Sequence, residues 1–182
     1  MKLAILIPCL VETRHLTERL IKELTRQINE IGTDEVVILK HEDNREKTTG
    51  RKRNELVQKA VDLGASHIAH HDSDDLPGAT YVRRYLECVE GDFDCAELWG
   101  NYFVKNKLIK PFHHSTIYTE WYETNEHYCR SINHLNCQRL SIAKNFPFPD
   151  QVFGEDGQQS MKMIGAFKTE MKIPEVIYHY YK

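Results

Sequence analysis

The chain has 182 residues, of which 41% are hydrophobic and 28% are charged, and its formal net charge at pH 7 is -3. This composition is typical of a globular protein and excludes a disordered chain. The slightly negative charge gives no general attraction to nucleic acid or to an anionic membrane. The length suits one domain with a substantial core, so we expect a single domain over residues 1–182.

The first apolar run extends from Leu3 to Val11, is interrupted by Pro8 and is too short to cross a bilayer. Only Lys2 precedes it after the initial methionine, and no small-residue cleavage site follows, so it makes a poor signal peptide. The five cysteines are scattered and odd in number, which favours reduced thiols. We therefore expect a cytoplasmic protein whose first apolar run is a buried strand.

The first half of the sequence alternates strands with helices. Apolar residues recur on one helical face of residues 15–31, and Gly32 is a natural stop. A continuous apolar run at 36–39 is typical of a parallel strand covered on both faces. The expected strands are 3–9, 36–39 and 66–71, and the expected helices are 15–31, 51–63 and 77–89, with Pro77 in the first turn of the last. This alternation predicts a parallel sheet with helices on both faces, linked by right-handed crossovers.

The second half has a different pattern. Residues 95–107 and 112–121 are rich in aromatic side chains and threonine, which predicts strands of a mixed sheet. Residues 125–149 combine a strand with loops, 157–167 form a short helix, and 176–181 form a final strand or extended tail. The expected fold class is therefore α/β, with a parallel half over about 1–92 and a mixed-sheet half over about 93–182.

A histidine and cysteine cluster lies in the second half. Four of its side chains are possible zinc ligands: His127, Cys129, His134 and Cys137. Residues 131–135 alternate as in a strand, which would send these side chains to different faces. We therefore interpret them as ordinary packed residues rather than as a zinc site.

Three carboxylates follow the strand predicted at 66–71: Asp72, Asp74 and Asp75. Carboxylates this close repel one another unless a cation lies between them. The end of a strand is also where an open α/β sheet places its ligands. The pattern indicates a hard divalent ion shared with a substrate phosphate. The alternative is an acidic turn with Asp75 near the start of a helix.

Several motifs along the chain resemble one family. They are Ile7-Pro8 followed by Glu12 and Arg14, Gly50-Arg51-Lys52-Arg53-Asn54, Asp72-Ser73-Asp74-Asp75, Phe148-Pro149-Asp150 and Gly154-Glu155-Asp156. In order and spacing they resemble the inverting family-two glycosyltransferases of the GT-A fold. The resemblance covers most of the chain. It implies a Rossmann-like nucleotide-sugar-binding half over about 1–92 and an acceptor half with the catalytic base over about 93–182.

The chain also departs from that family. It is short and has no room for a large acceptor domain. The Gln-x-x-Arg-Trp signature of the processive polymerases is absent after Asp156, where residues 158–161 read Gln-Gln-Ser-Met. These departures favour transfer of one sugar at a time from a nucleoside-diphosphate sugar to an acceptor hydroxyl.

The resemblance implies a metal site and a base. Asp74 is the first candidate ligand for Mn²⁺ or Mg²⁺ and Asp75 the second, while Asp72 would contact the ribose or share the metal. His179, in a tyrosine-rich tail, would complete the metal shell unless it is a packing residue. Asp156 would be the catalytic base, with Glu155 in reserve. Simple helix capping is the alternative role of Asp156.

For the nucleotide, the ends of the strands supply candidate contacts. They are Pro8, Glu12 and Arg14 after the first strand, Asp43 or its neighbour Glu42 after the second, and the basic pair Lys52 and Arg53. A carboxylate after the second strand would accept a hydrogen bond from a uracil or guanine ring nitrogen. The basic pair would meet phosphate, unless it is part of a solvated helix face.

Two other functions share much of this pattern. A sugar-1-phosphate nucleotidyltransferase would carry a glycine-rich loop after the first strand, but residues 9–14 contain no glycine. A non-catalytic nucleotide-sugar-binding module is the second alternative, since fold does not guarantee activity. The acceptor stays open among a glycan, a small molecule, a protein side chain and a modified nucleobase on DNA. The last would use the basic residues Arg45, Lys47, Arg51, Lys52 and Arg53.

Overall fold

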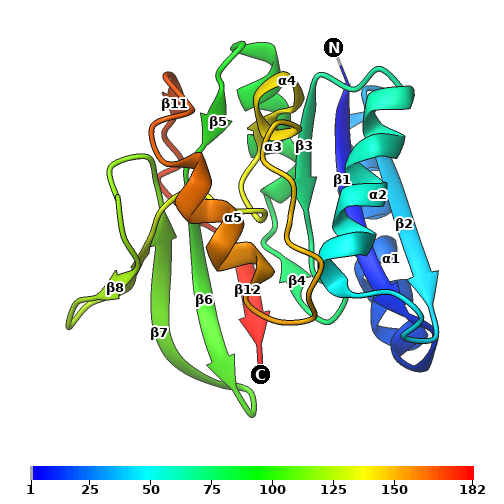
Figure 1. The fold of residues 1–182 in the computed structure, drawn as a ribbon, viewed down its shortest axis with the longest axis horizontal. Coiled ribbons are helices and arrows are strands. Elements are labelled where there is room, and N and C mark those ends of the chain that lie inside the picture. Colours follow the sequence, from blue (N-terminus) through cyan, green and yellow to red (C-terminus); the bar gives the residue numbers. More distant parts are fainter. Residues whose placement is uncertain (1) are drawn as a thin grey trace.

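The computed structural model describes residues 2–182. Six strands form the first sheet, in the order β11-β5-β10-β3-β1-β2 (Figure 1). Strand β1 pairs in parallel with both β2 and β3, and β10 runs antiparallel to β3. The strands are β1 (Leu3–Leu10), β2 (Val36–Asp43), β3 (His67–His70), β5 (Cys95–Ala96), β10 (Gln138–Arg139) and β11 (Glu170–Met171). The expected parallel arrangement of the first three long strands is confirmed.

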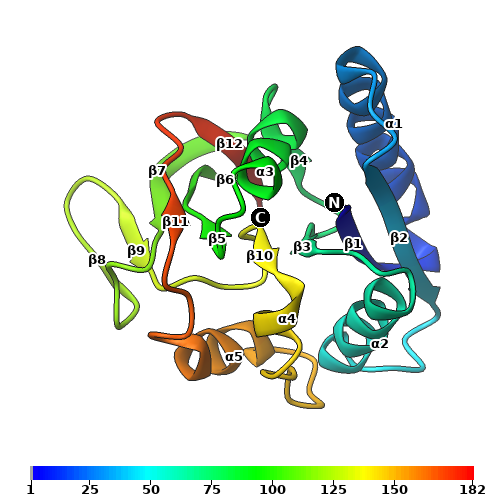
Figure 2. The same cartoon turned by 90° about the horizontal axis from the view of Figure 1, so that it is seen from above.

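Helices cover both faces of this sheet (Figure 2). They are α1 (Arg14–Ile31), preceded by the short η1 (Val11–Thr13), α2 (Thr49–Asp62), α3 (Tyr81–Glu90), α4 (Leu140–Ala143) and α5 (Glu155–Met163). Because side chains alternate along a strand, Leu3 and Ile5 of β1 pack among residues of α1 and α3, and Ala4 and Leu6 pack among residues of α2 and α4. This burial on both faces explains the unbroken apolar sequence of β1.

Six further strands form a second sheet in the order β4-β12-β6-β7-β9-β8. They are β4 (Leu76–Pro77), β6 (Leu98–Val104), β7 (Lys107–His114), β8 (Tyr122–Glu123), β9 (Tyr128–Arg130) and β12 (Val176–Tyr181). Figure 2 shows β8 and β9 on the side of the molecule away from β1 and β2. The expected α/β fold, with a parallel part and a mixed-sheet part, is confirmed.

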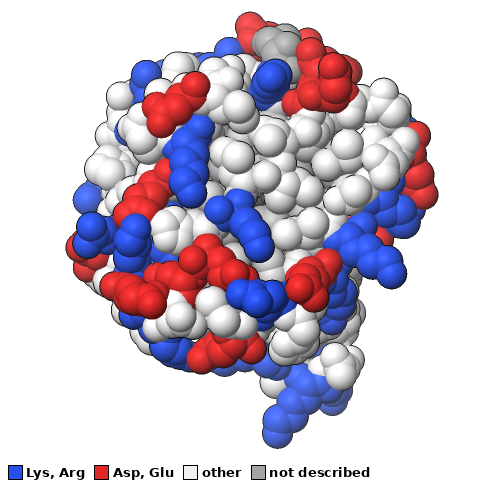
Figure 3. All heavy atoms as spheres, turned by 90° about the vertical axis from the view of Figure 1, so that its right-hand side faces the viewer, with Lys and Arg blue, Asp and Glu red and all other residues white. Residues whose placement is uncertain are grey.

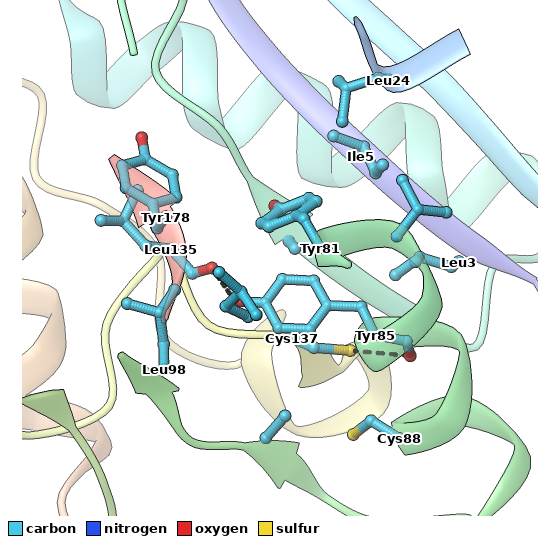
Figure 4. Close-up of a cluster of buried hydrophobic side chains, with 14 of the residues drawn as sticks. Leu3, Ile5, Leu24, Tyr81, Tyr85, Cys88, Leu98, Leu135, Cys137 and Tyr178 are labelled. Carbon is cyan, nitrogen blue, oxygen red and sulfur yellow. Dashed lines mark hydrogen bonds between the residues drawn. The ribbon is translucent and has the colours of Figure 1, made fainter. Parts of the chain in front are cut away.

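A tyrosine-rich core joins the two sheets (Figure 4). Tyr81, Tyr85 and Tyr178 are all fully buried. The hydroxyl of Tyr85 donates to the carbonyl oxygen of Leu135 at 2.8 Å, which satisfies a buried polar group and fixes the loop before β10. This loop carries several of the polar residues described below.

Some predicted elements differ from the structure. The third helix begins at Tyr81 and not at Pro77, which lies in β4 opposite Tyr178 of β12. The strands expected at 95–107 and 112–121 have the wrong bounds, because β6 and β7 form a hairpin that turns at Lys105 and Asn106, both with positive φ. The strand expected at 176–181 is confirmed as β12. Strand β2 lies at the edge of its sheet and is only partly buried.

The last helix starts earlier than predicted. It begins at Glu155, so Asp156 lies in the first turn and not before the helix. Gly154 precedes it with φ of 76°, a conformation that glycine adopts without strain. The alternation predicted at 131–135 is also wrong, because the segment between β9 and β10 is irregular. Among residues 2–182, no helix is long and apolar enough to cross a membrane.

Candidate active site

A cavity of about 870 Å³ opens where β1 and β3 end. The second sheet and the start of α5 form its other walls, and Figure 1 shows α5 beginning near the edge of the sheet where these strands end. This volume is in the range of small-molecule sites, and the edge is where open α/β sheets bind ligands. Seven residues predicted from sequence line it: Pro8, Lys52, Arg53, Asp72, Asp74, Glu155 and Asp156.

Asp72 is held by two partners at the centre of the cavity. Its Oδ1 accepts a hydrogen bond from Nη2 of Arg53 at 2.8 Å, and its Oδ2 lies 3.5 Å from Nε2 of His134. Burial alone would raise the pKa of Asp72, but the charge of Arg53 and the contact with His134 outweigh it and hold this pKa well below its usual range. Asp72 is therefore a permanently charged anchor in the cavity.

Asp74 and Asp75 have opposite environments. Asp74 is exposed at the cavity and makes no ion pair within residues 2–182. Asp75 is buried and does not line the cavity, because its carboxylate accepts hydrogen bonds from the hydroxyl of Tyr178 at 2.7 Å and the amide of Tyr181 at 2.8 Å. Burial and the nearby charge of Asp72 raise the pKa of Asp75 to about 8. Asp75 thus ties β12 to the turn after β3.

Asp156 and Glu155 line the cavity from the first turn of α5. Oδ2 of Asp156 lies 3.9 Å from Nδ1 of His134, the same ring that contacts Asp72. Oε1 of Glu155 lies 3.5 Å from Nε of Arg53. Burial raises the pKa of Glu155, which is only 4% exposed. These contacts form a chain of polar groups that runs from Glu155 through Arg53, Asp72 and His134 to Asp156.

The remaining residues predicted for the nucleotide surround the cavity without lining it. Asp43 pairs with the buried ammonium of Lys52 at 2.9 Å, which outweighs the effect of desolvation and lowers the pKa of Asp43. Glu12 pairs with Arg45, a cavity residue. Arg14 pairs with Glu42 at 2.8 Å on the exposed surface and does not line the cavity.

His179 is not brought to the carboxylates. It lies on the opposite face of β12 from Tyr178 and Tyr180, and its ring packs 5.9 Å from that of Phe103. Tyr180, in contrast, lines the cavity. The role of His179 as a metal ligand stays a prediction without a contact to support it.

The cavity fits a divalent ion that a diphosphate would help to hold. Within residues 2–182 there is no group of three or more His, Cys, Asp or Glu side chains arranged to hold a metal. Mg²⁺ in proteins usually has one or two carboxylate ligands and completes its shell with substrate phosphates and water. Desolvation and the charge of Asp72 raise the pKa of Asp74, so a cation beside it would be stabilising. Asp74, with Asp72 next to it, provides such a set.

The four histidines and cysteines considered for zinc lie in different places. Cys137 belongs to the main core, and Cys129 is buried in β9. The ring of His127 packs edge-on to Trp99 with centroids 5.2 Å apart. His134 is the one that lines the cavity, which the sequence interpretation missed.

Further cavity residues come from β9 and from the position just before β8, and were not predicted as site residues. Trp121, Tyr128 and Arg130 line the cavity beside α5. No short motif marks them. Their signal in the sequence is limited to the aromatic richness of the segment, which a strand or a core would also produce.

The basic residues considered for a DNA acceptor do not form a free cationic surface. Lys52 and Arg53 are buried and paired. Lys47 and Arg51 both contact Glu55, and Arg45 pairs with Glu12. Figure 3 shows lysines and arginines interspersed with acidic residues on the side formed by α1, β2 and α2. Little net positive charge remains there to attract a polyanion.

Comparison with solved structures identifies proteins of similar fold. The whole chain superposes on Staphylococcus aureus TarS residues 1–349 in complex with UDP-GlcNAc, with a TM-score of 0.68 and 16% identity, and covers 59% of that structure. The TarS complex with UDP gives a TM-score of 0.66 and 16% identity, with 61% covered. A putative nucleotide-diphospho-sugar transferase from Desulfovibrio desulfuricans gives a TM-score of 0.51 and 12% identity, with 82% covered.

The amino-acid sequence matches no protein-family model and no curated protein. At these identities the structural likeness shows the fold alone, which is that of the GT-A-like nucleotide-sugar transferases. The chain spans about three fifths of the TarS 1–349 structures.

Proposed function

We propose that this protein transfers one sugar from a nucleoside-diphosphate sugar to an acceptor hydroxyl, with inversion, in a reaction that requires Mn²⁺ or Mg²⁺. The observation that carries the proposal is the cavity in which two carboxylates come from different elements: Asp74, exposed and without an ion pair among the described residues, and Asp156 at the start of α5. The structural neighbour TarS binds UDP-GlcNAc on the same fold, which supports a donor of this class.

The donor would lie at the ends of β1 and β3. A divalent ion held by Asp74 would neutralise the negative charge that develops on the leaving diphosphate. The buried side chains of Lys52 and Arg53 add positive charge to the same wall, and their partners Asp43 and Asp72 fix their positions. Pro8 lines the cavity at the end of β1, where the nucleoside would pack.

Asp156 would act as the base. Its carboxylate accepts the proton of the acceptor hydroxyl, and the hydroxyl oxygen forms a bond to the anomeric carbon from the face opposite the diphosphate. The bond between that carbon and the diphosphate oxygen breaks, and the nucleoside diphosphate leaves with the electron pair. His134, between Asp72 and Asp156, would hold the base in a fixed position relative to the donor.

The test is an assay of a panel of UDP-, GDP-, ADP- and CDP-sugars with Mn²⁺, in which release of the nucleoside diphosphate is measured with and without candidate acceptors. We expect release with at least one donor, and we expect excess chelator to abolish it. Pyrophosphate release from a nucleoside triphosphate and a sugar 1-phosphate would support nucleotidyl transfer instead. Donor binding without any turnover would support a non-catalytic module.

A further inference from the structure

The cations that line the cavity differ in their partners. In the first half of the chain each one has an acidic partner: Arg45 with Glu12, Lys47 with Glu55, Lys52 with Asp43, and Arg53 with Asp72 and Glu155. In the second half, Arg130 and Lys182 line the same cavity and make no ion pair within residues 2–182. A half-buried guanidinium without a counter-ion is unusual, because burial disfavours an uncompensated charge.

Arg130 is held in place without neutralisation. Its Nη1 donates to the carbonyl oxygens of Tyr122 and Cys129, both at 2.9 Å, which anchors it to β8 and β9. Its guanidinium lies 5.0 Å from the ring centroid of Trp121 and 5.4 Å from that of Tyr128. Its other guanidinium nitrogens have no hydrogen-bond partner in the described part of the chain. Burial lowers the pKa of Arg130 by more than nearby groups, among them Glu123 and Asp156, raise it.

Arg130 lies on the side of the cavity that holds the candidate base, Asp156. Trp121 donates from its indole nitrogen to the hydroxyls of Ser131 at 3.2 Å and of Ser160 in α5 at 3.3 Å, so its ring is fixed against that helix. A Cβ placed on Gly157, the neighbour of Asp156, would lie 3.6 Å from the Trp121 ring. Arg130 therefore stands beside the first turn of α5 and the candidate base. The exposed carboxylate Asp74, in contrast, has Arg19 as its nearby cation.

We infer that the acceptor carries an anionic group, a phosphate or a carboxylate, which Arg130 binds while the hydroxyl to be glycosylated lies at Asp156. This inference rests on the proposed function and names the class of acceptor. A guanidinium with free N–H groups binds either anion through paired hydrogen bonds. The fixed rings of Trp121 and Tyr128 flank it and provide the apolar surface on which a ring or carbon chain packs.

The experiment uses protein saturated with UDP and Mn²⁺, so that the donor's diphosphate site is filled. Three probes that share one ring are titrated by calorimetry: glucose, glucose 6-phosphate and glucuronate. We expect at least one anionic probe to bind at least tenfold more tightly than glucose. The phosphate and carboxylate probes compared with each other identify which anion the site prefers.

Variants of Arg130 test whether this residue binds the anionic probe. Arg130→Gln should weaken binding of the preferred anionic probe at least tenfold, and Arg130→Lys should retain part of it, because the charge stays and the paired geometry is lost. The matched control is Arg83→Gln, an exposed arginine of α3 outside the cavity, which should change nothing. The circular dichroism spectrum and thermal unfolding of each variant, measured first, report that it is folded, and its UDP affinity is measured next.

Three results would overturn the acceptor assignment while UDP binding is intact: equal affinity for the three probes, no binding of any probe, or unchanged anion binding in Arg130→Gln. A loss of UDP affinity in a folded Arg130→Gln protein would assign Arg130 to the donor instead. If the wild-type protein does not bind UDP, the nucleotide that it binds among GDP, ADP and CDP takes the place of UDP in every titration. Failure to bind any of the four would overturn the proposed donor site and this inference with it.

Discussion

Asp156 is the residue whose chemistry is easiest to isolate. It lies in the first turn of α5, where a carboxylate stabilises the helix, and it also faces the cavity 3.9 Å from His134. Asp156→Asn keeps the size of the side chain and removes its basicity. We expect sugar transfer to fall by about two to four orders of magnitude, the usual loss when a general base is removed.

UDP affinity and thermal stability of Asp156→Asn should stay close to those of the wild type, because a base is needed only while the acceptor loses its proton. Asp34→Asn, a change at an exposed loop position, is the control for loss of an aspartate elsewhere. If Asp156→Asn transfers sugar at the wild-type rate, Asp156 is not the base. Glu155 would then be the candidate, and Glu155→Gln would test it.

For single residues, the sequence predicted many of the charged side chains that line the cavity, but it did not predict their partners. Asp72, Asp74, Glu155 and Asp156 follow strands or open a helix in recognisable motifs, and all four line the cavity. His134 could not be predicted, because its loop has no regular structure. It is held by long-range bonds, such as that from the amide of His70 to the carbonyl oxygen of His134 at 2.9 Å.

Helix α2 meets the segment that leads into α5, and one glycine makes this contact possible. The amide of Gly50 donates to the carbonyl oxygen of Gln151 at 3.1 Å, and a Cβ at Gly50 would lie 1.9 Å from the carbonyl oxygen of Pro149. Gly50→Ala should lower the free energy of unfolding by about 1–3 kcal/mol, the usual cost of overpacking. Because residues 149–154 lead into α5, it should also reduce transfer.

Gly157→Ala is the matched substitution. Its Cβ would make an ordinary contact at 3.6 Å with Trp121, in a helical backbone that any residue adopts. We expect stability to rise by up to about 1 kcal/mol, the difference in helix propensity between alanine and glycine. Urea unfolding at neutral pH measures both variants, and equal stability of Gly50→Ala and the wild type would contradict the contact described here.

Elements with local signals were predicted well, and those that depend on distant partners were not. The amphipathic pattern and glycine stop of α1 give its bounds, since Gly32 does cap it with a left-handed conformation. Pro77 was assigned to a helix by a local rule, but pairing with Tyr178, far along the chain, places it in a strand. A local preference loses to such a tertiary contact.

The whole molecule buries several neutral histidines, and this gives its stability a pH dependence. Burial, with a smaller contribution from His134, lowers the pKa of His114 to about 3 from a usual value of 6.5. Below pH 6.5 the unfolded chain binds a proton at this position and the folded protein does not, so stability is lost as the pH falls toward 3. The loss approaches about 1.4 kcal/mol per pH unit for this one group.

His114→Gln removes the protonation of this histidine. Its effect must be read from the difference between wild type and variant, because Asp75 changes the stability of both with pH in the opposite direction. Its raised pKa of about 8 makes the folded form bind the extra proton, so this group adds stability as the pH falls through 8. Urea unfolding of wild type and His114→Gln from pH 7.5 to 4.5 isolates the histidine. We expect the wild type to lose more stability than the variant below pH 6.5, and parallel curves would contradict a neutral buried His114.

The central claim is that the cavity binds a nucleoside diphosphate through a metal ion held by Asp74. Calorimetric titration of UDP, and of GDP, ADP and CDP in parallel, into the protein with Mn²⁺ and again with excess chelator tests it directly. We predict saturable binding of at least one nucleotide with Mn²⁺, weakened at least tenfold by chelator and to a similar extent by Asp74→Asn. Binding of none of the four nucleotides, or an affinity that neither chelator nor Asp74→Asn changes, would contradict it.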